Sequence, residues 1–283
     1  MKNKIKNSKI FRYLDKTNSS MNKITTLEYQ NTVLKEEISN LKDSLLILND
    51  KLDKLNDSIT FNNKISNENL FATIFHDSSK NSEWLDIPLS LSSWAIGYPY
   101  AYILFRILDE IKPKNILEMG MGQSTKIINE YVKHSKNIKY DIVEHDKNWI
   151  DFFKTNTNVD ELSNIHLLKN YKREYNGTLI NAYKNFKKEF KNYKFDFISI
   201  DGPVGSGQEY SRMDIIDLIP DCLRETFVIL LDDCERIGEQ RTIEILETKL
   251  NENGIEFSTG YRYWGRTSVY ICVSKNLDFL CHI

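Results

Sequence analysis

The chain begins with a long stretch in which apolar side chains recur at alternating spacings of three and four residues. These positions run from Ile24 to Ile59, with leucine at every d position and one polar residue, Asn31, among the a positions. A heptad held over five repeats is typical of a coiled coil. Leucine at d with a single asparagine at a favours a parallel homodimer, in which Glu37 at g faces Lys42 at e of the second copy. The alternative is one amphipathic helix packed on the rest of the chain, although a helix of on the order of 55 Å is hard to bury on one domain.

The region before the heptad is polar and basic. Residues 1–23 contain seven lysines and arginines against one acid, Asp15. We expect a solvated, disordered end, and the alternative is a tether to an anionic membrane surface or a partner. The heptad stops at about residue 67. The pattern therefore predicts a basic polar segment over 1–23, a coiled coil over 24–66 and a globular domain over 67–283.

In the globular domain, short apolar runs alternate with helical patterns. Strands are predicted over 116–118, 140–144, 165–168, 195–201 and 226–232, and helices over 101–111, 124–134, 147–154, 178–192, 211–219 and 238–251. This alternation predicts an α/β fold with a doubly wound parallel sheet. The last two apolar runs, 257–263 and 267–273, are separated only by a short turn over 264–266. They predict an antiparallel hairpin at the end of the chain.

Composition limits the functional classes. A chain of 283 residues has room for one α/β domain plus an appendage, and its net charge of −2 gives no general preference for nucleic acid. Its four cysteines lack paired metal or redox spacing, which fits a reducing compartment. The sequence has no apolar run long enough for a transmembrane helix and no signal-peptide pattern. We therefore expect a cytoplasmic protein.

A glycine-containing loop over 118–125 joins the first predicted strand to a helix. Its alternate glycines, Gly120 and Gly122, would let a ligand lie against bare backbone at the helix N-terminus. Glu144 ends the next strand 22 residues after Gly122, close to the distance at which an acid binds the ribose diol in nucleoside-binding folds. The third glycine of a dinucleotide loop is replaced by Thr125. A tight turn in an unrelated α/β domain is the alternative.

The Glu-x-Gly-x-Gly form of this loop, with Glu118 first, resembles motif I of the Rossmann-like S-adenosylmethionine-dependent methyltransferases. The resemblance implies S-adenosylmethionine as the cofactor and a seven-stranded sheet whose last strand is antiparallel. It also implies roles for the residues of the motif. Glu118 would lie near the methionine amino group and Glu144 on the ribose hydroxyls, and the other cofactor-binding candidates are Gly120, Gly122, Gln123 and Ser124.

Further acids follow the fourth and fifth strands, where the site of an open α/β sheet lies. Asp201 is the expected general base and also a cofactor-binding candidate, and Asp233 is the second catalytic candidate. Because alternate strand residues face opposite sides, we expect only one of Asp232 and Asp233 in the site.

Asp201 and Asp233 could instead bind a divalent cation, as the resemblance to metal-dependent catechol-type O-methyltransferases implies. Cys234 stands where that family prefers asparagine. Helix capping is a purely structural alternative for these acids.

A second resemblance covers several of the same positions. The segments Asp201-Gly202-Pro203, Arg212-Met213 and Asp233-x-x-Arg236 are similar to motifs of the plant glucuronoxylan O-methyltransferases, with Ser211 and Asp232 as departures. The resemblance implies a sugar hydroxyl as acceptor. It also implies that Arg212 and Arg236 bind an acidic or phosphorylated glycan, although Arg236 could equally pair with neighbouring glutamates.

These observations predict an S-adenosylmethionine-dependent O-methyltransferase that acts on a saccharide, such as a surface polysaccharide. A small phenolic or protein acceptor is a second interpretation. A third is a non-catalytic coiled-coil scaffold whose α/β domain binds a nucleoside ligand. No sequence feature identifies the acceptor.

Overall fold

The computed structural model describes residues 2–89, 91, 95–157, 159–262 and 267–282. The chain divides into two compact units, Met1–Phe61 and Asn62–Ile283. The helix α1 (Lys2–Ser79) supplies all of the first unit and the beginning of the second. The turn predicted over 264–266 lies outside the described residues.

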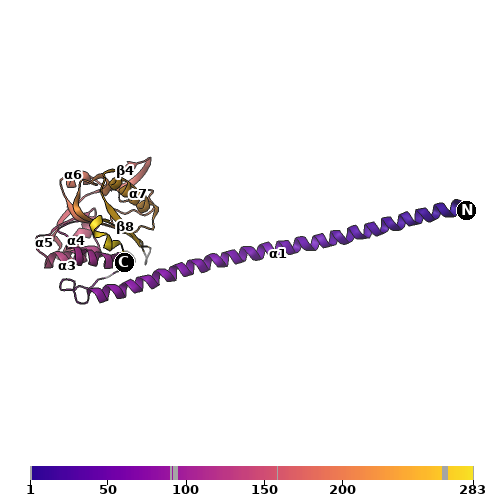
Figure 1. Cartoon of the computed structure of the whole chain (residues 1–283), viewed down its shortest axis with the longest axis horizontal. Helices are drawn as coiled ribbons and strands as arrows, with labels where there is room; N and C mark the ends of the chain where they lie inside the picture. Colours follow the sequence, from indigo (N-terminus) through magenta and orange to yellow (C-terminus); the bar gives the residue numbers. More distant parts are fainter. Residues whose placement is uncertain (1, 90, 92–94, 158, 263–266, 283) are drawn as a thin grey trace. The chain divides into compact units, whose positions relative to one another are not determined.

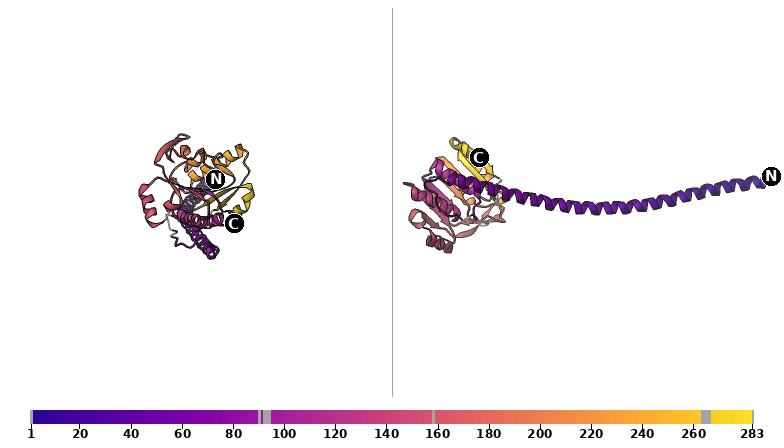
Figure 2. Two further views of the ribbon diagram at one scale, coloured as in Figure 1. Left: turned by 90° about the vertical axis from the view of Figure 1, so that its left-hand side faces the viewer. Right: turned by 90° about the horizontal axis from the view of Figure 1, so that it is seen from below.

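The helix α1 is continuous over its 78 residues (Figures 1 and 2). No proline or glycine precedes Pro88, so no residue in this stretch breaks a helix. The helix predicted over the heptad is confirmed. The prediction of a disordered end over residues 1–23 is wrong, because residues 2–23 continue the same helix. Every apolar a and d side chain from Ile24 to Ile59 is at least half exposed. None of the described helices is long and apolar enough to span a membrane.

The last turns of α1 belong to the second unit. Phe75 is buried there, and its ring centroid lies 6.2 Å from that of Phe105. The Tyr98 amide donates a hydrogen bond of 2.6 Å to the Glu68 carboxylate. Tyr98 begins α2 (Tyr98–Arg106), which continues into the π-helical turn η1 (Ile107–Ile111) and accounts for the helix predicted over 101–111.

The second unit contains a seven-stranded sheet with the order β3-β2-β1-β6-β7-β9-β8. The first five of these strands are parallel, and β9 runs antiparallel to both β7 and β8. Their bounds are β1 (Asn115–Met119), β2 (Lys139–Glu144), β3 (Asn164–Leu167), β6 (Phe195–Ile200), β7 (Leu223–Leu231), β8 (Phe257–Arg262) and β9 (Val269–Ser274). The predicted doubly wound sheet and its antiparallel terminal hairpin are confirmed.

Helices cover both faces of the sheet (Figure 1). One face carries α3 (Gln123–His134), α4 (Lys147–Asn156) and α5 (Val159–Leu162), and the other carries α6 (Phe186–Phe190) and α7 (Ile237–Glu252). Successive residues of β1 therefore point to opposite faces of the sheet. Ile116 packs in the hydrophobic core beneath α3 and α4, and Leu117 packs in the core beneath α6 and α7. The strand order reverses at β1, which pairs with β2 on one side and with β6 on the other. A ligand site is expected at the carboxyl ends of these strands.

One predicted helix is absent. Where a helix was expected over 178–192, β4 (Asn170–Tyr175) and β5 (Thr178–Tyr183) form an antiparallel hairpin, and only α6 is helical. The hairpin turns at Asn176 and Gly177, both with positive φ, which is the Asn-Gly signal of a two-residue turn. The helix expected over 211–219 is the short 3-10 helix η2 (Met213–Asp217).

Candidate functional site

The two glycines of the predicted cofactor loop have different surroundings and different structural roles. Gly120 has φ +95°, and a Cβ placed on it would lie 3.0 Å from the Gly202 amide nitrogen. The loop after β1 thus touches the loop after β6 backbone to backbone, and the Asp201 amide donates to the Met119 carbonyl at 2.9 Å. Gly120 is required for this close approach. Its expected contact with a cofactor stays a prediction.

Gly122 has the opposite surroundings. Its backbone is extended (φ −165°), and a Cβ there would meet no described atom within 4 Å. A side chain is therefore compatible with the fold, yet it would fill the space directly in front of α3. Gln123, the first residue of α3, is half-buried, whereas Ser124 is buried beneath the loop. Gly122 offers the surface that a cofactor at a helix N-terminus needs.

Glu118 is fully buried below this loop. The Tyr140 hydroxyl donates to its Oε2 atom, and the Ser124 and Thr125 hydroxyls lie close to the carboxylate. Oε1 has no hydrogen-bond partner among the described residues. Burial raises the pKa of Glu118 to about 7 against the lowering effect of these hydroxyls. The role predicted for Glu118 beside the methionine amino group stays a prediction.

Glu144 connects the end of β2 to the same loop. Its Oε2 atom accepts from the Met121 amide at 3.1 Å, and Oε1 accepts from the amides of His145 and Asp146. Trp149 reinforces this connection, because its indole nitrogen donates to the Met121 carbonyl at 2.7 Å. Glu144 therefore lies beside the glycine loop, where the sequence predicted it, and its hydrogen bonds fix the shape of that loop.

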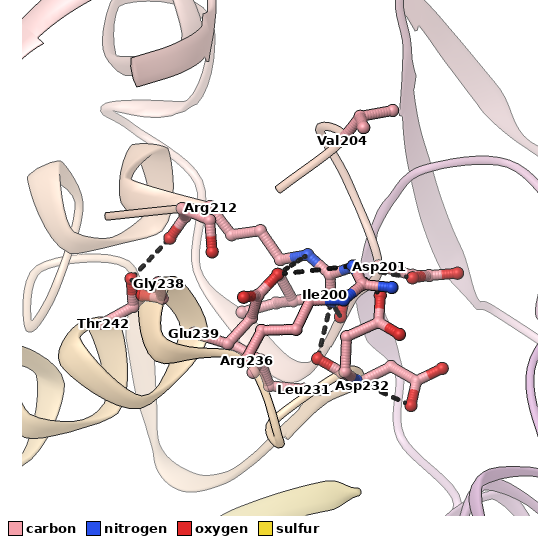
Figure 3. Close-up of polar contacts among 12 residues, drawn as sticks. Ile200, Asp201, Val204, Arg212, Leu231, Asp232, Arg236, Gly238, Glu239 and Thr242 are labelled. Carbon is pink, nitrogen blue, oxygen red and sulfur yellow. Dashed lines mark hydrogen bonds and ion pairs between the residues drawn. The ribbon is translucent and has the colours of Figure 1, made fainter. Parts of the chain in front are cut away.

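The acids after β6 and β7 converge on one buried cation (Figure 3). Arg212 is 2% exposed and donates to Asp201 Oδ1 at 3.0 Å and to Asp233 Oδ2 at 2.6 Å. It also donates to the Asp232 carbonyl at 2.7 Å, and its Nε atom lies 3.6 Å from Glu239. A buried arginine with this many acceptors holds the ends of β6, β7 and α7 together. The structure thus gives Arg212 an internal role and leaves it no surface for the glycan contact predicted from the sequence.

The acids of this cluster differ in exposure. The side chain of Asp201 is 33% exposed, Asp233 is buried and Glu239 is completely buried. Burial raises the pKa of Asp201, while the charge of Arg212 opposes the shift. Burial and the neighbouring aspartates raise the pKa of Asp232. Asp201 is therefore the member of the cluster whose carboxylate is open to an acceptor.

The predicted divalent cation site does not fit this arrangement. Both of its expected ligands, Asp201 and Asp233, already accept hydrogen bonds from the guanidinium of Arg212. A cation bound to the same oxygens would face a buried positive charge. In the part of the chain that the structure describes, no three His, Cys, Asp or Glu side chains are arranged to hold a metal. Arg236, which is 37% exposed and pairs with Asp233 at 2.7 Å, still presents part of its guanidinium to solvent.

Sequence reasoning missed Tyr183, the last residue of β5. Its buried hydroxyl has no hydrogen-bond partner among the described residues and lies where a Cβ of Gly202 would be. The hairpin also touches the loop after β6, because the Asn181 side chain donates to the Val204 carbonyl at 2.7 Å. The Asn-Gly turn could have revealed the hairpin, but only the fold shows that the hairpin borders the site.

A known protein family matches the part of the chain that contains the site. The family model of the spermine/spermidine synthase domain matches residues 105–277, more than half of the chain and all strands of the sheet. The chain belongs to the spermine/spermidine synthase domain family. The family match includes the glycine loop, Asp201 and the Arg212 cluster. No curated protein matches the chain. The similarity to glucuronoxylan O-methyltransferases therefore rests on the motifs alone.

Solved structures similar to this member of the spermine/spermidine synthase domain family include methyltransferases. An O-methyltransferase from Bacillus cereus, in complex with SAH, is 16% identical with a TM-score of 0.46, covering 74% of this chain and 91% of that one. The O-methyltransferase TomG from Streptomyces achromogenes, in complex with SAM, is 13% identical with a TM-score of 0.46, covering 74% and 89%. The precorrin-6y C5,15-methyltransferase from Geobacter metallireducens is 15% identical with a TM-score of 0.42, covering 66% and 94%. These likenesses concern the fold.

Proposed function

We propose that the protein is an S-adenosylmethionine-dependent O-methyltransferase with a saccharide hydroxyl as acceptor. One observation carries the proposal: the loop bearing the partly exposed Asp201 is joined directly to the glycine loop. The Asp201 amide donates a hydrogen bond to the Met119 carbonyl, and the backbone of Gly202 packs against that of Gly120. A base candidate and a cofactor surface thus lie side by side at the switch point of the sheet.

The described residues fit such a cofactor at Gly122, near Glu118 Oε1 and beside Glu144. When bound, S-adenosylmethionine supplies a methyl group on a sulfonium and leaves as S-adenosylhomocysteine. Asp201 would accept the proton of the acceptor hydroxyl, and the glycine loop would hold the methyl donor beside that hydroxyl. Most of the acceleration would come from alignment, which can contribute about 7–11 kcal/mol.

The saccharide acceptor rests on the motif similarity and on Arg236. Its partly exposed guanidinium lies beside Asp233 and could bind an acidic group of a glycan. A small phenolic or protein acceptor would use the same base. A non-catalytic scaffold would bind the nucleoside without turnover. The four cysteines are buried, and their lack of paired metal or redox spacing suits the cytoplasm as the place of the reaction.

The family match favours one further candidate, the synthesis of a polyamine. In that reaction the sulfonium donor would give up an aminopropyl group to an amine rather than a methyl group to an oxygen. The two proposals share the glycine loop and differ in the group transferred. Mass spectrometry of the products formed from S-adenosylmethionine and from its decarboxylated form would distinguish them.

Binding of the cofactor product is the first test. We expect S-adenosylhomocysteine to bind the wild-type chain in a calorimetric titration, and Gly122→Val to weaken binding at least about tenfold. The valine would fill the cofactor surface without straining an extended backbone. Thermal melting should show the variant folded. Absence of binding to the folded wild-type chain would remove both methyltransferase proposals, the one with a saccharide acceptor and the one with a phenolic or protein acceptor.

We also propose that α1 forms a parallel homodimer through the exposed heptad. In that register Lys23 faces Glu28 and Glu37 faces Lys42 of the second copy, and Asn31 faces its own counterpart. An antiparallel pairing would place Asn31 against a leucine at d, where its amide would be buried without a partner.

Substitutions at d positions test the dimer. Sedimentation equilibrium should show that Leu41→Glu/Leu48→Glu weakens self-association at least about 100-fold, because each buried leucine contributes about 1.5–3 kcal/mol. The matched control is Leu46→Glu/Ile47→Glu, which adds the same charge to the same part of the helix outside the a and d positions. A monomeric wild type, or equal loss in both variants, would contradict the coiled coil.

A further inference from the structure

The first turns of α1 present a basic face and an apolar face. Arg12, Lys16 and Lys23 share one side of the helix, because their spacings of four and seven residues are helical repeats. Ile10 and Leu14 lie nearly opposite, together with Phe11 and Met21, and each of these four apolar side chains is more than half exposed. A helix divided in this way is amphipathic with a cationic polar side.

The proposed coiled coil does not account for this apolar face. In the heptad register that begins at Ile24, Ile10 and Tyr13 fall at a and d positions, but Thr17 and Ser20, the a and d residues nearest to Ile24, are polar. Phe11, Leu14 and Met21 fall at b and e positions, outside the contact line between two helices. A second copy of the chain would therefore leave these three side chains in water. They require a different occupant.

Two properties identify that occupant. Seven cations against one acid in residues 1–23 favour an anionic partner. Exposed phenylalanine, leucine, isoleucine and methionine require an apolar environment next to that charge. A nucleic acid backbone satisfies only the first requirement. The surface of an anionic phospholipid bilayer satisfies both, because its headgroups attract lysine and arginine while the acyl boundary accepts the apolar side chains.

We propose that residues 9–23 of α1 bind the surface of an anionic membrane, with Phe11 and Leu14 in the headgroup–acyl boundary and Arg12 and Lys16 on the phosphates. The helix lies on the bilayer and does not span it, in accordance with its polar composition. This inference is independent of the reaction proposed above. A parallel dimer would present two such segments at the same end, which strengthens attachment through avidity.

Co-sedimentation of the full chain with lipid vesicles tests the proposal. The wild type should bind vesicles that contain phosphatidylglycerol more tightly than vesicles of phosphatidylcholine alone, and less tightly at high salt. Arg12→Gln/Lys16→Gln should weaken binding at least about tenfold, since each cation near such a surface contributes about fivefold. Phe11→Gln/Leu14→Gln should also weaken it, although this pair removes no charge.

The matched control is Lys51→Gln/Lys54→Gln, which removes two exposed lysines farther along the same helix. It should bind as the wild type does, and circular dichroism should show equal helix content in all variants. Equal binding to both kinds of vesicle, or equal loss in the control, would overturn the proposal. Binding to a nucleic acid duplex with no binding to vesicles would also overturn it.

Discussion

Replacing Arg212 with methionine is expected to lower the free energy of unfolding by about 3–5 kcal/mol. The guanidinium is buried between Asp201, Asp233 and Glu239, so its removal leaves carboxylates facing one another without a cation. Methionine has a similar length but cannot supply the hydrogen bonds. Chemical denaturation followed by circular dichroism would measure the change.

Two further variants show whether the loss comes from the buried charge. Arg236→Met removes a half-exposed cation from the same cluster and should cost no more than about 1 kcal/mol, since solvent screens its ion pairs. Adding Glu239→Gln to Arg212→Met should recover part of the loss, because Glu239 is then no longer a buried anion. A variant at position 212 with wild-type stability would show that Arg212 does not hold the strand ends together.

Much of the sheet could be predicted because its central strands are buried on both faces. Short apolar runs such as Phe-Ile-Ser-Ile before Asp201 are typical of buried strands. Their alternation with helices implies that these strands pair in parallel. The loop after β1 and the acids at the strand ends follow from the same rule, because parallel strands all end at one edge. Asp201 and Glu144 were therefore expected near the glycine loop, and both lie there.

Burial of a polar residue was harder to predict. The sequence does not distinguish the roles of Gly120 and Gly122. In the structure, a Cβ on Gly120 would contact the backbone of Gly202, whereas a Cβ on Gly122 would contact no described atom. The motif predicts a substrate-binding role for Arg212, because the acids that bury it come from three separate elements and are not adjacent in the sequence. Only the tertiary fold brings Asp201, Asp233 and Glu239 together.

Two other regions carry local signals for structures that the sequence patterns did not predict. The strand β4 is polar and the hairpin lies outside the main sheet, although Ile180 of β5 enters the core. The Asn176-Gly177 turn is the informative local feature. In residues 2–23 the charge density favoured disorder, whereas the absence of proline and glycine allows the helix to continue. High charge does not prevent a helix when nothing interrupts the backbone.

Asp201→Asn is expected to reduce methyl transfer by about 10²–10⁴-fold while S-adenosylhomocysteine still binds within a few-fold of the wild-type affinity. Asparagine keeps the size of the side chain and an oxygen for the Arg212 hydrogen bond, but it cannot take a proton from the acceptor hydroxyl. Single-turnover assays with a saccharide acceptor, combined with calorimetric titration, would separate the loss of chemistry from a loss of binding. Asp221→Asn, at an exposed site outside the cluster, is the matched control and should retain full activity.

The pH profile separates a base from a purely structural carboxylate. The active form of a general base is deprotonated, so the rate should fall as the pH falls through the pKa of Asp201. Burial raises this pKa, which moves the loss of activity to a higher pH than for an ordinary aspartate. In Asp201→Asn the residual rate should lose this dependence, because the titrating group is gone. If Asp201→Asn kept the wild-type rate, or if its residual rate still fell at low pH as the wild-type rate does, another group would remove the proton. Asp201 would then act only as a partner of Arg212.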